Sequence, residues 1–94
     1  MIRLSKIGNS ARTVRVTFAL PVDQAATGCS VVGDFNGWEP GVHPMRKRSN
    51  GTRSASVTLP RDTRVQFRYL GDDGRWFNDP DVTEFDGSDS VLVV

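Results

Sequence analysis

The sequence predicts an all-β domain in which about seven short antiparallel strands form a two-sheet sandwich. Apolar and polar residues alternate with a period of two along several segments, and no long segment shows helical periodicity. Nine glycines and five prolines supply frequent turn signals between these segments. A series of short strands at this spacing is typical of immunoglobulin-like sandwiches.

The first half of the chain contains the longest alternation, in which Val14, Val16 and Phe18 share one face of a half-buried strand. Pro21 ends this strand. Asn50-Gly51 predicts a type I′ hairpin turn, because both residue types accept positive φ angles. The strands predicted in this half cover residues 13–20, 30–32, 44–48 and 54–59.

The second half continues the pattern. Val65, Phe67 and Tyr69 alternate with polar residues, and Gly71 to Gly74 then turns the chain. The strands predicted here cover residues 64–69, 75–77 and 91–94. We interpret residues 1–11 as a flexible N-terminal segment and residues 12–94 as the sandwich domain.

The size and composition of the chain restrict its function. A length of 94 residues and a hydrophobic content of 37% allow one domain with a thin core. No apolar run approaches the roughly 20 residues of a membrane span. The single cysteine, Cys29, excludes an intramolecular disulfide, and the N-terminus lacks a secretory signal. We therefore expect a cytoplasmic, monomeric protein.

The charges are unevenly distributed along the chain. Residues 1–68 contain eleven Lys/Arg and four acidic residues, whereas residues 69–94 contain one arginine and seven acidic residues. We interpret this asymmetry as a dipolar surface and not as a nucleic-acid footprint. The Arg46-Lys47-Arg48 triplet is interpreted as a solvated strand, because alternation divides it between two faces.

Catalytic and metal-binding constellations are weak. The sole histidine, His43, precedes a proline and is assigned a structural or indifferent role, and Cys29 is interpreted as a small buried hydrophobe. The acidic residues between Asp79 and Asp89 are interpreted as solvated turn acids, because their spacing does not match a calcium loop. We expect no enzyme activity, no cofactor and no metal.

The two tryptophans are the candidate binding residues. Trp38 lies in a polar loop, and Trp76 follows the Gly71 to Gly74 turn. Arg68 is out of phase with Val65 and Phe67, so it faces solvent near Trp76. An exposed indole stacks on the C–H face of a sugar ring, and a guanidinium donates to its hydroxyls. A sugar platform and a pair of core tryptophans both fit these residues.

Six landmarks in order resemble carbohydrate-binding module family 48. They begin with Val31-Val32-Gly33-Asp34-Phe35-Asn36-Gly37-Trp38 and end with Ser90-Val91-Leu92-Val93, with Asn50-Gly51, 57–60, 65–69 and 73–80 between them. This family includes the N-terminal domains of isoamylases and glycogen branching enzymes, and the glycogen-binding domain of the AMP-activated protein kinase beta subunit. The resemblance implies an immunoglobulin-like early-set sandwich that binds α-1,4-glucans.

The resemblance also implies a set of carbohydrate-binding residues. Trp38 and Trp76 match the two stacking tryptophans, and Arg68 takes the place of a sugar-contacting lysine. Phe85 falls near an apolar residue that reaches into the glucan ring, and Asp89 stands where many members have asparagine. Phe35 resembles a core aromatic, and Gly33 and Gly37 become permissive turn positions.

Two functions follow from these observations. The first is non-catalytic binding of glycogen-type or starch-type α-1,4-glucan through Trp38 and Trp76. The alternative is an accessory domain that has lost sugar binding and docks a separate glucan-metabolising enzyme or a regulatory partner. A sugar titration distinguishes the two functions.

Overall fold

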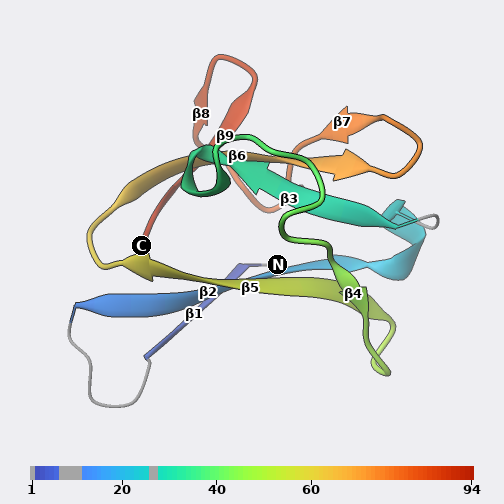
Figure 1. Cartoon of the computed structure of the whole chain (residues 1–94), viewed down its shortest axis with the longest axis horizontal. Helices are drawn as coiled ribbons and strands as arrows, with labels where there is room; N and C mark the ends of the chain where they lie inside the picture. The colour runs from blue at the N-terminus through green and yellow to red at the C-terminus, as the bar shows by residue number, and fades with distance from the viewer. Residues whose placement is uncertain (1, 7–11, 26–27) are drawn as a thin grey trace.

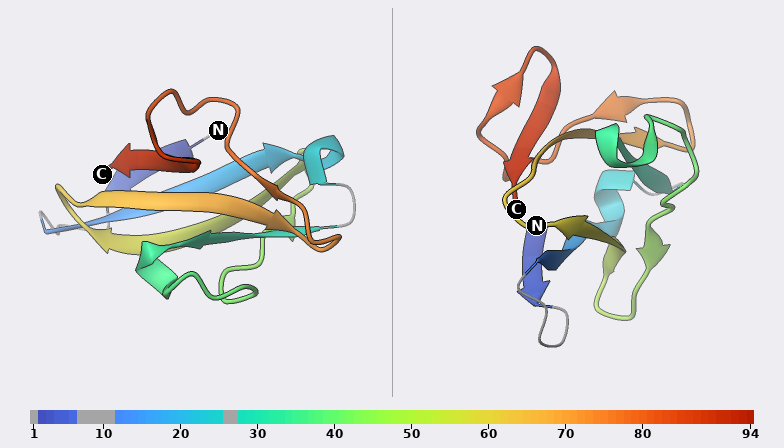
Figure 2. Two further views of the ribbon diagram at one scale, coloured as in Figure 1. Left: turned by 90° about the horizontal axis from the view of Figure 1, so that it is seen from above. Right: turned by 60° about the vertical axis from the view of Figure 1, so that its left-hand side comes forward.

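A computed structural model describes residues 2–6, 12–25 and 28–94 as two antiparallel sheets packed face to face (Figure 1). The predicted all-β sandwich of immunoglobulin-like type is confirmed. None of the helices formed by these residues is long and apolar enough to cross a membrane. The first sheet has four strands and the second has five, and hairpins project from both (Figure 2).

The first sheet has the strand order β1-β2-β5-β4. Its strands are β1 (Ile2–Lys6), β2 (Thr13–Pro21), β5 (Thr52–Pro60) and β4 (Arg46–Lys47). Ile2–Lys6, within the N-terminal segment that we predicted to be flexible, pair with β2 from Ile2↔Phe18 to Lys6↔Val14. The rest of that predicted segment, residues 1 and 7–11, lies outside the described residues.

The second sheet has the order β3-β6-β9-β8, and β7 pairs with β6 beside this path. Its strands are β3 (Cys29–Gly33), β6 (Arg64–Gly71), β9 (Asp89–Val93), β8 (Phe85–Asp86) and β7 (Trp76–Phe77). Two short 3-10 turns, η1 (Val22–Ala25) and η2 (Asp34–Asn36), follow β2 and β3. The β6–β7 and β8–β9 hairpins both project from this sheet, away from the first (Figures 1 and 2).

The strand β8 has no counterpart among the predicted strands, because it has only two residues. Its signal is the turn that follows. Asp86 pairs with Asp89 across a two-residue loop in which Gly87 has a φ of 62°. Gly at the first central position of a two-residue loop is typical of a type II′ hairpin turn.

The Asn50-Gly51 hairpin is present, but its turn type differs from the predicted one. Gly51 has a φ of 81°, whereas Asn50 is absent from the described residues with positive φ. Gly51 N donates to Arg48 O and Arg48 N donates to Thr52 O. This pattern is a three-residue loop that ends in a left-handed glycine. The Gly71–Arg75 hairpin uses the same arrangement, with Gly74 at a φ of 85°.

The core lies between the sheets and centres on Phe18. Its ring lies 4.9 Å from the ring of Phe67, 6.0 Å from that of Phe35 and 6.4 Å from that of Tyr69, measured between centroids. The core face of each long strand is the apolar set that the alternation predicted. Phe35 packs against this core at the end of β3, in agreement with the core role that the resemblance implies.

Candidate binding surface on the second sheet

The outer face of β6 carries the candidate site. Val65, Phe67 and Tyr69 face the core, so Gln66, Arg68 and Leu70 face outward. Leu70 pairs with Trp76 on β7, and Trp76 is 41% exposed. The Arg68 guanidinium carbon lies 5.9 Å from the centroid of the Trp76 ring, within range of a cation–π interaction. Arg68 and Trp76 therefore form one continuous surface.

The Arg68 side chain is partly buried. Its Nε is buried and has no hydrogen-bond acceptor among the described residues. Val32, its cross-strand partner on β3, is 0% exposed although it is outside the core cluster between the sheets. The outer face is thus covered at this position, and the buried Nε is out of reach of a surface ligand. The Nη1 and Nη2 groups of the same guanidinium carry the donors that a ligand hydroxyl at this surface would meet.

Trp38 lies in the loop that leaves β3, and it is half-buried. Its backbone is held in the left-handed region with a φ of 59°, directly after Gly37 at 67°. A bulky residue adopts this conformation only when its surroundings enforce it. Here Trp38 N donates a 2.9 Å hydrogen bond to Gly33 O, which closes the loop.

Asn36 enforces this loop through its side chain. Its Oδ1 accepts from Gly33 N at 3.0 Å, and its Nδ2 donates to Val31 O at 3.1 Å. The same Nδ2 lies 3.0 Å from His43 Nδ1, so the segment before β4 also contacts the loop. Of the structural and indifferent roles predicted for His43, these contacts support the structural one, and its carbonyl also accepts from Val31 N.

Gly33 is required for space and not for its φ angle. Its backbone is extended, with a φ of −166°. A Cβ atom at this position would lie 2.6 Å from Gln66 O and 2.6 Å from Phe35 Cε1. The interpretation of Gly33 as a permissive turn position is therefore wrong, whereas Gly37 at a φ of 67° fits it.

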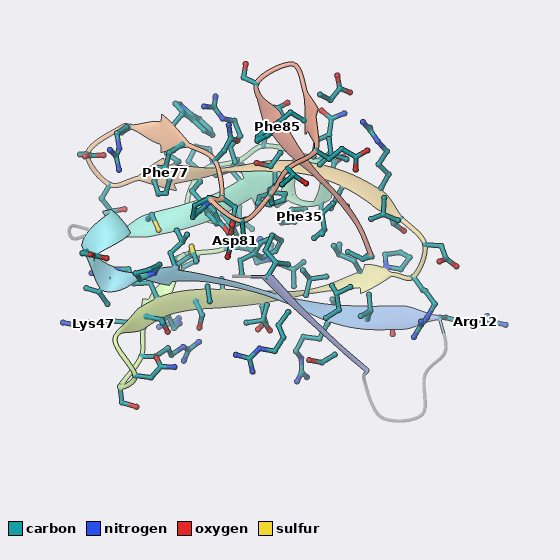
Figure 3. All side chains as sticks on the ribbon, turned by 180° about the vertical axis from the view of Figure 1, so that it is seen from behind. Arg12, Phe35, Lys47, Phe77, Asp81 and Phe85 are labelled. Carbon is teal, nitrogen blue, oxygen red and sulfur yellow. The ribbon has the colours of Figure 1, made fainter. Side chains whose placement is uncertain are left out.

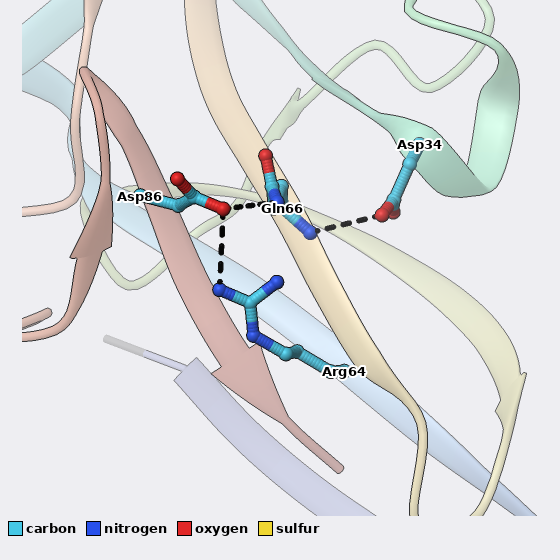
Figure 4. Close-up of polar contacts among 4 residues, drawn as sticks. All are labelled: Asp34, Arg64, Gln66 and Asp86. Atoms are coloured by element: carbon cyan, nitrogen blue, oxygen red, sulfur yellow. Dashed lines mark hydrogen bonds and ion pairs between the residues drawn. The ribbon is translucent and has the colours of Figure 1, made fainter.

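Polar contacts attach the β8–β9 hairpin to this face (Figure 4). Asp86 Oδ2 accepts from Gln66 Nε2 at 2.9 Å and from the Arg64 guanidinium at 3.4 Å. On the other side of β6, Gln66 N donates to Asp34 Oδ2 at 3.2 Å. Residues of η2, β6 and β8 are thus connected by hydrogen bonds next to Arg68 in the sequence of β6.

Asp89 and Phe85 occupy different faces of the hairpin. The β6–β9 register pairs Gln66 with Val91, so Asp89 continues the outward row toward Arg68. Phe85 pairs with Ser90, which belongs to the opposite set, and it is 49% exposed. Figure 3 shows Phe85 on the β8–β9 hairpin, apart from Phe77 on β7. The structure thus brings Arg68, Trp76 and Asp89 to one face and separates Phe85 from them.

Asn78 and Asp79 connect β7 to the rest of the sheet. Asn78 Nδ2 donates to Ser88 O, and Ser90 Oγ donates to Asn78 Oδ1, both at 2.9 Å. Asp79 is 2% exposed and accepts a 2.6 Å hydrogen bond from the Tyr69 hydroxyl. Burial, with the neighbouring Asp79 carboxylate, raises the pKa of Tyr69 far above its usual range. The interpretation of Asp79 as a solvated turn acid is therefore wrong.

Nucleophilic chemistry finds no support in these contacts. Cys29 is buried, its Sγ lies 3.4 Å from Met45 Sδ, and burial raises the pKa of its thiol. The interpretation of Cys29 as a buried hydrophobe is confirmed. Among the described residues, no group of three His, Cys, Asp or Glu side chains is placed to hold a metal ion.

Several residues of this face escaped the sequence analysis. The alternation that places Arg68 on the outer face also places Gln66 and Leu70 there, so these two residues could have been predicted. The contacts of Asn36, Asn78 and Asp86 could not be predicted, because alternation along one strand does not indicate which residues of other segments they meet.

Comparison with known proteins identifies the kind of domain. The sequence profile of carbohydrate-binding module 48 (isoamylase N-terminal domain) matches residues 9–86. A 1,4-alpha-glucan branching enzyme, GlgB 2, of Xanthomonas campestris pv. campestris is 51% identical over 49 residues, which is 49% of this chain. The 1,4-alpha-glucan-branching enzyme of Solanum tuberosum is 36% identical over 59 residues, or 55% of this chain.

The relatives are much longer than this chain. The matched segment covers 6% of the Xanthomonas enzyme and 7% of the Solanum enzyme. The similarity is therefore to one domain of each relative.

Proposed function

The chain belongs to carbohydrate-binding module family 48, and from that premise we propose that it binds α-1,4-glucan chains without catalysing a reaction on them. The observation that supports this proposal most is the pair formed by Trp76 and Arg68. An exposed indole with a guanidinium at 5.9 Å offers a stacking surface beside a hydroxyl donor. Branching enzymes that act on 1,4-alpha-glucan are among the relatives of the chain.

In this proposal the sugar ring stacks on Trp76 and its hydroxyls approach Arg68. Trp38 supplies a second stacking surface, and the Asp89 carboxylate accepts a hydrogen bond from a sugar hydroxyl. Phe85 contacts a chain that extends past the β8–β9 hairpin. Each stacked ring buries on the order of 100 Å² of apolar surface, or about 2.5 kcal/mol before the ordering costs. We expect a Kd of about 10 μM to 1 mM.

The test is a calorimetric titration with maltoheptaose or β-cyclodextrin, with cellohexaose as the stereochemical control. Trp76→Ala, Trp38→Ala and Arg68→Gln should each weaken binding of the α-glucans by about tenfold or more. Leu4→Ala is the matched control, because Leu4 is an exposed apolar side chain on the first sheet. Equal affinity for cellohexaose, or equal loss in the Leu4 variant, would contradict the proposal.

The alternative is an accessory domain that has lost sugar binding and docks a glucan-metabolising enzyme or a regulatory partner. The half-buried state of Trp38 supports it, because burial reduces the area that this indole offers to a sugar. A folded protein that shows no heat of binding up to millimolar glucan would favour the alternative. In both cases we propose a cytoplasmic monomer, in keeping with the single buried cysteine.

A further inference from the structure

The charge asymmetry of the sequence becomes a difference between the two sheets. The four strands of the first sheet, Ile2–Lys6, Thr13–Pro21, Arg46–Lys47 and Thr52–Pro60, contain no aspartate or glutamate. The seven acidic residues of the second half lie in or beside the strands β6 to β9 of the second sheet. Figure 3 shows two of the basic side chains at opposite ends of the first sheet, Arg12 directly before β2 and Lys47 on β4.

The outer face of the first sheet is built from arginines and hydroxyls. Val14 and Val16 face the core, so Arg15 and Thr17 face outward, and Arg15 pairs with Ser5 and Thr58. On the far side Arg46 pairs with Ser54. We name this surface the basic face, which consists of Arg3, Ser5, Arg15, Thr17, Arg46, Arg48, Ser54, Ser56 and Thr58.

The guanidinium groups of the basic face are accessible. Arg3, Arg15, Arg46 and Arg48 are all exposed. Arg48 Nε donates to Ser54 Oγ at 2.8 Å, and Thr17 Oγ1 lies 3.0 Å from Ser56 Oγ, so these contacts are with neutral groups. An acidic residue, Asp81, shares a pocket with Arg3 at the rim. Arg15 and Arg46 lie on opposite sides of β5, through their pairs with Thr58 and Ser54.

We propose that the basic face docks an acidic segment of a partner protein, one rich in aspartate or glutamate. An arginine fork binds a carboxylate with two parallel hydrogen bonds, and neighbouring hydroxyls can donate to the same oxygens. The outward residues of β2 and β5 include no aromatic side chain, so they offer no stacking surface for nucleobases.

This interaction does not depend on glucan binding. The basic face and the Trp76–Arg68 surface lie on the outer faces of different sheets, with the core between them. One molecule can therefore hold an acidic partner and a ligand on the second sheet at the same time.

The experiment is a fluorescence-anisotropy titration of a labelled oligoglutamate peptide at low and near-physiological ionic strength. We expect saturable binding that weakens as salt is added. Arg15→Gln/Arg46→Gln should weaken binding by about tenfold, whereas Arg64→Gln/Arg75→Gln, which removes the same charge from the second sheet, should change it by less than about threefold. The glucan titration of the Arg15/Arg46 variant should match that of the wild type.

Four results would overturn the proposal. Equal loss in both double variants would mean that only net charge matters. No binding at near-physiological salt would mean that the face is merely solvated. Tighter binding of a DNA duplex than of the peptide would assign the face to phosphates. Concentration-dependent self-association that the Arg15/Arg46 variant abolishes would identify the acidic half of a second copy as the occupant.

Discussion

The hydroxyl of Tyr69 donates a 2.6 Å hydrogen bond to Asp79 Oδ2, and both side chains are buried. Tyr69 lies on β6 and pairs with Phe77, two residues before Asp79. The second carboxylate oxygen of Asp79 accepts from Asp81 N at 2.8 Å. This bond attaches the chain that follows Trp76 to the core side of β6, and so it holds one wall of the candidate site in place.

Removal of the Tyr69 hydroxyl should destabilise the fold. Tyr69→Phe leaves a buried carboxylate oxygen without this donor, and we expect a loss of about 1–3 kcal/mol in the free energy of unfolding by urea. Thr17→Val is the control, because it also deletes one hydroxyl but from an exposed contact with Ser56. Equal losses of unfolding free energy in the two variants would show that the buried hydrogen bond stabilises the fold no more than the exposed one.

The same residue predicts the alkaline behaviour of the protein. The pKa of Tyr69 is raised in the folded state, so its contribution to stability is complete below its usual value of about 10 and is lost as the pH rises above it. Tyr69 is the sole tyrosine. Tyrosinate absorbance should therefore appear only with unfolding. Ionisation near pH 10 in a protein that remains folded would contradict this prediction.

Two glycines should differ in why they resist substitution. Gly33→Ala places a Cβ atom against Gln66 O and Phe35, and we expect a loss of about 1–3 kcal/mol from overpacking. Gly37→Ala meets no atom within 4 Å but requires a φ of 67°, which costs about 1–2 kcal/mol. Thermal unfolding measures both losses. Gly37→Asn should recover much of its loss and Gly33→Asn should not, because asparagine tolerates positive φ but needs the same space.

Asn36 should couple stability to glucan binding. Asn36→Ala removes the contacts to Gly33 N, Val31 O and His43, so we expect a loss of about 1–3 kcal/mol and a lower affinity for maltoheptaose as Trp38 loses its orientation. Asn50→Ala is the control, since Asn50 is exposed and, among the described residues, its side chain accepts from the nearby Thr52 hydroxyl alone. Unchanged glucan affinity in a destabilised Asn36 variant would show that Trp38 does not need this loop.

Most strands could be predicted because their signal is local. A residue that must face the core within β2, β5 or β6 recurs at every second position, and this pattern is independent of the partner strand. Strand β1 was missed although Ile2 and Leu4 show the same alternation. It has five residues, two of them basic, so the pattern is too short to predict a strand. β8 is shorter still, and only its Gly87 turn indicates it.

The candidate site was predictable only in part. Alternation and motif order are properties of the chain, and they were enough to predict the β sandwich, the outward phase of Arg68 and the resemblance that selects Trp38 and Trp76. The burial of Asp79, the need for space at Gly33 and the gathering of basic residues on the outer face of one sheet became visible in the folded structure alone. Each of these depends on pairs of residues that are far apart in the sequence, and their distances are set by packing.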